Sequence, residues 1–147
     1  MLIDIYSVGL WDHTLSGCGI VLIAKDESGQ MRKREFSISL SAACKEAAEL
    51  QSATVALASI LHRYRSHKIL LHTASRFVAG VVTRGLQRAD CANIIAEFKK
   101  WLGFYSSLTV VLDDGGSPHI ITAKELARHA LKARTNTDSE TQEYAGN

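Results

Sequence analysis

The spacing of apolar residues changes once along this chain, and that change constrains the fold more than any other feature. Up to residue 40 the pattern is typical of strands, with alternating or short continuous apolar stretches at residues 2–8, 17–24 and 32–40. A turn-forming cluster with a glycine, residues 26–30, separates the last two stretches. These features predict an antiparallel meander of three strands.

The pattern then changes to a period near 3.6 residues. Ala47, Leu50, Leu57 and their neighbours predict a long helix over residues 43–63. The remainder predicts a strand at 68–72, helices capped by Ser75 and Asp90, a strand at 108–112, and a last helix. A capping-box pattern at residues 122–125 predicts the start of that helix, which runs to about residue 134. This order predicts an α/β fold, a mixed sheet with helices on its faces.

Length and charge indicate one domain with a short tail. The 147 residues, 46% of them hydrophobic, suffice for one buried core. We assign residues 1–134 to the domain and 135–147 to an acidic tail that is predicted to be disordered. The net charge is +2, and the tail contains three acids with neither lysine nor arginine. The body is therefore mildly basic, which is compatible with nucleic-acid binding but does not require it.

Two further features bear on location and metal chemistry. No apolar run is long enough to span a bilayer, and the first residues do not resemble a secretory signal, so we expect a cytoplasmic protein without membrane contacts. The cysteines, Cys18, Cys44 and Cys91, are scattered and form no CxxC pair. We therefore predict neither a disulfide framework nor a metal site, and interpret the cysteines as small apolar residues in a reducing compartment.

Four segments follow one another in an order that is typical of a known family. They are residues 3–9 (IDIYSVG), 48–57 (AELQSATVAL), 71–78 (LHTASRFV), and 116–118 (GSP) followed by 124–128 (KELAR). Together they resemble the type 1 ribonuclease H family over almost all of residues 1–134. The resemblance implies a mixed five-stranded sheet, in which an antiparallel meander of the first three strands is followed by two parallel strands, with helices on both faces.

The family resemblance also implies a specific chemistry, hydrolysis of the RNA strand of an RNA:DNA hybrid by two Mg²⁺ or Mn²⁺ ions. Converging carboxylates must hold these ions, and the family supplies four of them. The matching positions here are Val8, Glu49, Ala74 and Lys124, and the histidine of the family's flexible loop matches Asp114. Three of the four acids are replaced, so the resemblance implies an inactive site without a metal cofactor and without catalytic residues.

Two hypotheses concern the remnant site. Lys124 would occupy part of the space of the missing metals and form an ion pair with Glu49; alternatively, both residues are ordinary solvated groups. In a divergent ribonuclease H, Asp113 and Asp114 would join Glu49 to bind Mg²⁺ or Mn²⁺. The alternative for these two aspartates is a turn, because they lie beside two glycines.

Two sets of residues are candidates for binding. Small polar and basic groups could contact nucleic-acid phosphates, namely Thr73, Ser75, Arg76, Lys99 and Lys100. A segment after the first strand could contact a protein partner, because aromatic anchors often dominate interfaces: Leu10, Trp11, Asp12 and His13.

We therefore predict a catalytically inactive RNase H-like domain that acts as a binding or architectural subunit in a nucleic-acid-processing or other multiprotein assembly. The alternatives are a non-cleaving binder of RNA:DNA hybrid or duplex nucleic acid, and the divergent ribonuclease described above. Protein partners are expected first, then nucleic acid. Self-association stays open, because the edge of residues 32–40 could pair with another chain or be guarded by its own charges.

Overall fold

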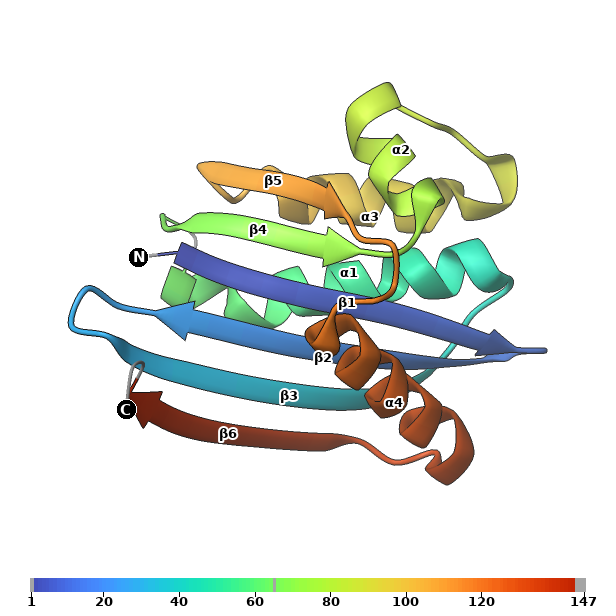
Figure 1. Ribbon diagram of the computed structural model, residues 1–147. Coiled ribbons are helices and arrows are strands. Elements are labelled where there is room, and N and C mark those ends of the chain that lie inside the picture. Colours follow the sequence, from blue (N-terminus) through green and yellow to red (C-terminus); the bar gives the residue numbers. More distant parts are fainter. Residues whose placement is uncertain (1, 65, 145–147) are drawn as a thin grey trace.

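The core of the fold is one mixed β-sheet. A computed structural model of the protein describes residues 2–64 and 66–144. Six strands lie in the order β5-β4-β1-β2-β3-β6 (Figure 1). They are β1 (Leu2–Asp12), β2 (Leu15–Lys25), β3 (Gln30–Ser41), β4 (Lys68–Thr73), β5 (Ser107–Leu112) and β6 (Thr137–Tyr144). The predicted antiparallel β1-β2-β3 meander is confirmed, and β4 and β5 are parallel to β1 as expected.

Helices cover both faces of the sheet, as predicted (Figure 1). The helices are α1 (Lys45–Tyr64), α2 (Arg76–Arg84), α3 (Ala92–Leu102) and α4 (Pro118–Ala133), with a short 3₁₀ turn, η1 (Ala89–Cys91). Helix α1 packs on β1 and β2, with α3 against α1, while α4 crosses β1, β2 and β3 on the opposite face. Among the described residues, no helix combines the length and the apolar character needed to cross a membrane.

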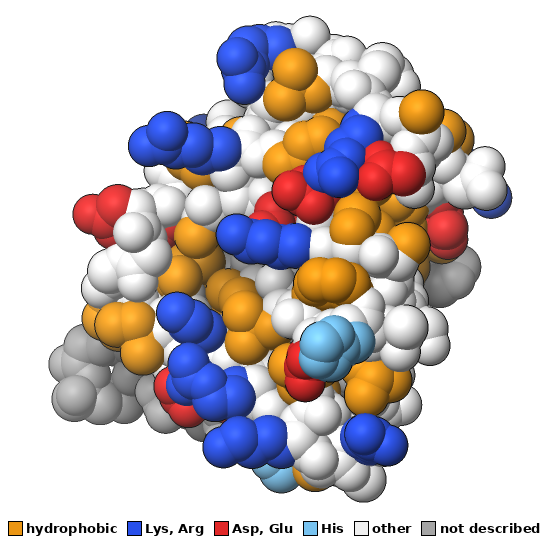
Figure 2. Space-filling view, turned by 90° about the vertical axis from the view of Figure 1, so that its right-hand side faces the viewer, with side chains coloured by type: hydrophobic (Ala, Val, Ile, Leu, Met, Phe, Trp, Pro, Cys, Tyr) orange, Lys and Arg blue, Asp and Glu red, His pale blue; other side chains and the backbone are white. Residues whose placement is uncertain are grey.

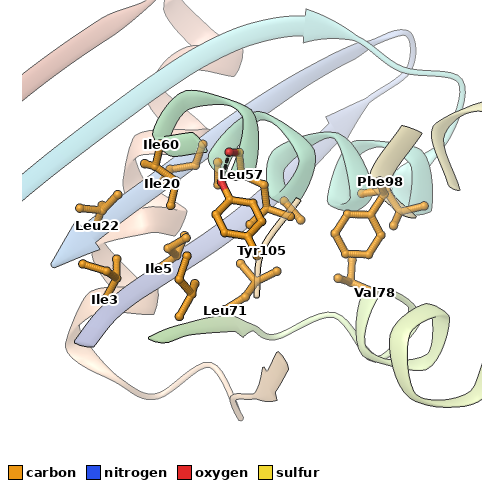
Figure 3. Close-up of a cluster of buried hydrophobic side chains, with 14 of the residues drawn as sticks. Ile3, Ile5, Ile20, Leu22, Leu57, Ile60, Leu71, Val78, Phe98 and Tyr105 are labelled. Atoms are coloured by element: carbon orange, nitrogen blue, oxygen red, sulfur yellow. Dashed lines mark hydrogen bonds between the residues drawn. The ribbon is translucent and has the colours of Figure 1, made fainter. Parts of the chain in front are cut away.

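The hydrophobic core lies between the sheet and α1. Ile3, Ile5, Leu57 and Phe98 are completely buried, and they come from strands and helices that are distant in sequence (Figure 3). Tyr105 also enters this layer, and its hydroxyl donates a hydrogen bond to the carbonyl oxygen of Leu57. Burial of these side chains fixes the position of α1, from which Glu49 projects.

Two of the predicted helix starts are wrong. Helix α4 begins at Pro118, because the Ser117 hydroxyl accepts from the amide of Ile120 and proline suits the first turn. The expected cap, Thr122, is therefore inside the helix. Likewise Asp90 lies in η1 and pairs with Arg88 instead of capping α3. The predicted Ser75 cap of α2 is formed, with the Val78 amide donating to the Ser75 hydroxyl at 3.1 Å.

The tail and the first hairpin also differ from the sequence prediction. Residues 137–144 form β6, so the sheet has six strands instead of five, and the edge of β3 is paired within the chain. An ion pair between β3 and β6 stabilises this polar strand, because the Arg34 guanidinium donates two hydrogen bonds to the Asp138 carboxylate, at 2.8 and 3.1 Å. Residues 145–147 of the predicted tail lie outside the described residues. The expected loop after β1 is a tight turn at His13, since β1 extends to Asp12.

Candidate functional site

The four positions that match the family's metal-binding acids line one hollow. Its volume is about 330 Å³, and Val8 of β1, Glu49 of α1, Ala74 after β4 and Lys124 of α4 all contribute to its wall. Side chains on β1 alternate between the two faces of the sheet, and Val8 is partly exposed toward this hollow. Residues that are up to 116 positions apart in sequence therefore lie together, as the match to the family predicts.

Gly9 allows Glu49 to approach the sheet. A β-carbon at Gly9 would lie 2.2 Å from the carbonyl oxygen of Ala48 and 2.8 Å from the Cα atom of Glu49. Only a residue without a side chain permits this contact between β1 and α1. The close packing places the Glu49 carboxylate next to the carboxyl end of β4.

The environment of Glu49 favours its neutral form. Burial raises the pKa of the Glu49 carboxyl above its ordinary value, while a hydrogen bond from the Ser75 hydroxyl and the charge of Lys45 act in the opposite direction. Within the described part of the chain, no ion pair joins Glu49 to Lys124. The predicted Glu49–Lys124 pair is therefore wrong, because Ser75 at the start of α2 is the group that meets this carboxylate.

Glu49→Gln is expected to stabilise the protein at pH 7. The folded-state pKa is raised, so the contribution of Glu49 to stability is present at low pH and lost as pH rises through that pKa. A neutral amide removes the cost of the buried charge and can still accept from Ser75. The gain should stay below about 1 kcal/mol, because solvent screens a half-buried group.

Urea unfolding at pH 7 and at a pH below the ordinary glutamate value of about 4.3 checks this expectation. The gain should appear only at pH 7, and the exposed Glu97→Gln should show none at either pH. A loss of stability at pH 7 in the Glu49 variant would show that the ionised form is the favoured one.

Asp113 and Asp114 form a turn. The backbone amide of Gly115 donates to Asp113 and that of Gly116 donates to Asp114, both at 2.8 Å. Asp114 is exposed at the rim of the hollow. Among the described residues, neither aspartate lies in a group with Glu49 whose ligand atoms are close enough together to share a metal ion. The residues present therefore do not fit the two-metal site of the family, and the turn interpretation accounts for both aspartates.

The candidate phosphate-binding residues fall into two groups. Thr73, Ser75 and Arg76 lie where β4 meets α2, at the hollow or in the shallow groove next to it. Thr73 is almost completely buried, and its hydroxyl accepts from the amide of Ser75 at 3.0 Å. Lys99 and Lys100 are exposed at the end of α3, and neither contributes to the wall of the hollow.

The candidate partner-binding segment is a hairpin. Leu10 lines the hollow. Trp11 is 39% exposed and donates its indole N–H to the carbonyl oxygen of Ala42 at 3.0 Å. Asp12 and His13 are exposed at the tip and lie 3.5 Å apart. The segment thus forms a ridge beside the hollow, and the Trp11–Ala42 hydrogen bond joins it to the chain after β3.

Lys45 is a member of the site that our sequence analysis missed. It is the first residue of α1, is exposed at the wall of the hollow, and interacts electrostatically with Glu49. Lys45 lies four residues before Glu49, which places both on one helical face, and this spacing could have predicted that Lys45 belongs to the site.

Figure 2 shows the face of the molecule toward which β1, β4 and β5 point. Basic side chains are spread across this face, between apolar and acidic ones.

Comparison with solved structures identifies the architecture. No family model matches the sequence, and no curated protein sequence matches it. Solved structures, in contrast, are similar over most of the chain. One is the crystal structure of LC9-RNase H1, a type 1 RNase H with the type 2 active-site motif. It superposes with a TM-score of 0.76 at 18% sequence identity, over 94% of this chain and 77% of that one. The fold is that of the type 1 ribonucleases H.

Two other structures agree. The N-terminal RNase H domain of rv2228c from Mycobacterium tuberculosis gives a TM-score of 0.73 at 14% identity, over 89% of this chain and 99% of that one. LC11-RNase H1 in complex with an RNA/DNA hybrid gives 0.62 at 17% identity, over 90% of this chain and 99% of that one. The resemblance inferred from four short segments thus extends to the whole RNase H-like fold of this chain.

Proposed function

We propose that this chain is a cytoplasmic, catalytically inactive RNase H-like domain that works by binding, with the backbone of an RNA:DNA hybrid or duplex nucleic acid as its ligand. The observation that carries the proposal is the composition of the hollow. Of the four positions where the family resemblance implies acids, only Glu49 is one; the other charged residues of the wall are Lys45, Lys124 and, at the rim, Asp114.

Cleavage is not expected of such a site. Two divalent ions carry four positive charges, and Glu49, a half-buried carboxylate whose pKa is raised, does not balance them. Asp114, the other acid of the wall, is exposed and accepts from the Gly116 amide within its own turn. Val8 and Ala74 offer no oxygen ligand from their side chains. Lys124 adds a positive charge in the space where a ligand would be required.

The same composition suits a phosphate backbone. Lysine ammonium groups form ion pairs with phosphates, and amides and hydroxyls at helix starts add hydrogen bonds. Lys45, Lys124 and Arg76 all lie at or beside the hollow and are exposed. That LC11-RNase H1, a protein of the same fold, was solved with a bound hybrid supports this choice of ligand.

A role as a subunit of a nucleic-acid-processing assembly is compatible with this binding. The ridge of Leu10 and Trp11 stands at the rim of the hollow, and Trp11 remains 39% exposed. A protein partner would contact the ridge while nucleic acid occupies the hollow.

Fluorescence anisotropy with a labelled RNA:DNA hybrid tests the proposal. We expect binding that weakens steeply between about 50 and 200 mM salt, because bound phosphates release counterions. The double variant K45A/K124A should lower the slope of log K against log salt by about 2, one per lost phosphate contact.

The matched control is K99A/K100A, which removes the same charge at the end of α3 and should leave affinity and slope nearly unchanged. Equal losses in both double variants would show a general charge effect instead of a site. No binding of the wild-type chain at low salt would favour the protein-partner role, and mutation of Trp11 would come next.

A further inference from the structure

A second cluster of chemically reactive side chains lies away from the hollow, at the start of α1 and of α3. The sulfur atoms of Cys44 and Cys91 lie 3.7 Å apart, although 47 residues separate them in sequence. The carboxylate of Asp90 is the third member. Its ligand atom and both sulfurs lie within 4.8 Å of one another, and no other such group occurs among the described histidines, cysteines and acids.

The distances suit one tetrahedral metal ion. Two thiolates on a zinc ion, each at about 2.3 Å, lie about 3.8 Å apart at the tetrahedral angle, whereas a disulfide requires about 2.05 Å. The observed 3.7 Å separation corresponds to the first geometry. Two sulfur ligands and one carboxylate leave a fourth position for water, which is common for this ion.

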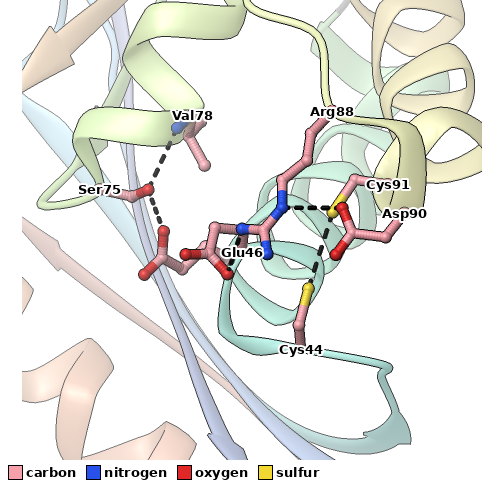
Figure 4. A network of polar contacts seen from close by, with 8 residues as sticks. Cys44, Glu46, Ser75, Val78, Arg88, Asp90 and Cys91 are labelled. Carbon is pink, nitrogen blue, oxygen red and sulfur yellow. Dashed lines mark hydrogen bonds and ion pairs between the residues drawn. The ribbon is translucent and has the colours of Figure 1, made fainter.

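The carboxylate is held in place by a neighbour. The Arg88 guanidinium contacts Glu46 at 2.8 Å and Asp90 at 2.7 Å, so one cation joins the start of α1 to η1 (Figure 4). The contact to Asp90 uses its Oδ1 atom. A hydrogen bond from an outer group to a ligating carboxylate is a usual feature of metal centres, because it fixes the orientation of the ligand.

The site is accessible, and its charge is favourable. Cys91 is buried, Cys44 is half-buried and Asp90 is exposed, and a hollow of about 280 Å³ reaches Asp90 and Cys91 from the surface. The two carboxylates outnumber the single guanidinium before either thiol ionises.

We propose that Cys44, Asp90 and Cys91 form a binding site for one thiophilic divalent cation of the zinc class. Its binding displaces the thiol protons, and the ion ties the start of α3 to the start of α1. Because Cys44 immediately precedes Lys45, the ion would also fix the helical turn that carries Lys45 and Glu49 at the hollow. Because both thiols must lose their protons to bind the ion, affinity should fall as pH is lowered.

Titration of the full chain with Cd²⁺ and Zn²⁺ tests this proposal. The chain is first stripped of metal and kept reduced with a phosphine. We expect a thiolate-to-Cd²⁺ charge-transfer band that saturates at one equivalent, and a rise in Tm on addition of Zn²⁺. C44A and C91A should each weaken Zn²⁺ binding by more than about 100-fold, and D90N by about tenfold. C18A removes the third cysteine, which is fully buried elsewhere, and should leave Zn²⁺ affinity and the Cd²⁺ band unchanged.

Three results would overturn the proposal. They are the absence of the band in a folded chain, undiminished binding in C44A, and recovery of the purified protein with Cys44 and Cys91 joined as a disulfide, two hydrogens lighter by mass. Cys44 is only half-buried, so C44A is expected to fold and can test the site even if C91A, which replaces a buried side chain, fails to fold. None of these readouts depends on hybrid binding, so this proposal and the proposed function fail separately.

Discussion

Gly19→Ala is expected to destabilise the fold by about 3 kcal/mol or more, at the upper end of the cost of overpacking. A β-carbon at Gly19 would lie 1.8 Å from the carbonyl oxygen of Ala123 and 2.6 Å from the amide nitrogen of Ala127. Both atoms belong to the backbone of α4, so no side-chain rotation can relieve the clash. Either α4 must move away from the sheet, or β2 must distort.

Thermal and urea unfolding measure the effect. The midpoint temperature should fall by roughly 10 °C for a chain of this size. Gly103→Ala is the matched control, because its β-carbon would meet nothing closer than 3.4 Å and its backbone is already helical. If Gly19→Ala unfolds within about 1 kcal/mol of the wild type, α4 does not pack on β2 as closely as the structure shows.

Restoring the missing acids is expected to create a metal site. The triple variant V8D/A74D/K124D would add three carboxylates to Glu49 around a hollow of about 330 Å³. Four converging acids can hold two divalent ions, and the removal of Lys124 takes away the competing charge. We expect Mn²⁺ binding, and cleavage of an RNA:DNA hybrid where the wild-type chain gives none.

Isothermal titration with Mn²⁺ and a gel assay with labelled RNA in a hybrid measure the two expectations. The control is the same triple variant carrying Glu49→Gln in addition, which should lose both signals. A folded triple variant that binds no Mn²⁺ would show that the four positions do not converge as the hollow suggests.

The sequence predicted the architecture because each element has its own periodicity. The alternation in β1 and β3 and the apolar run of β2 specify a meander, and the 3.6-residue spacing of Leu50 and Leu57 specifies α1. β6 escaped prediction for a physical reason. It is a polar edge strand held by Arg34–Asp138 and by the Asn136 side chain, which accepts from the amide of Ser39, and such pairing leaves no apolar pattern.

The sequence could predict which residues lie at the candidate site, but not which side chains contact one another there. Matching segments placed Val8, Glu49 and Lys124 at one location, and the structure places all three at the wall of one hollow. The partner of Glu49 is Ser75, a choice that depends on how α1 and α2 pack. The Cys44–Cys91 pair was missed for the same reason, since spacing along the chain gave no sign of their proximity in space.

Incubation of the wild-type chain with a labelled RNA:DNA hybrid and Mn²⁺ tests whether the hollow binds without cleaving, with the gel read for both cleavage and retarded mobility. We expect retarded, intact hybrid at low salt. Cleavage by the wild-type chain that disappears in Glu49→Gln would contradict this proposal, because a site that keeps one of the family's four acids would then support the chemistry that we infer it has lost.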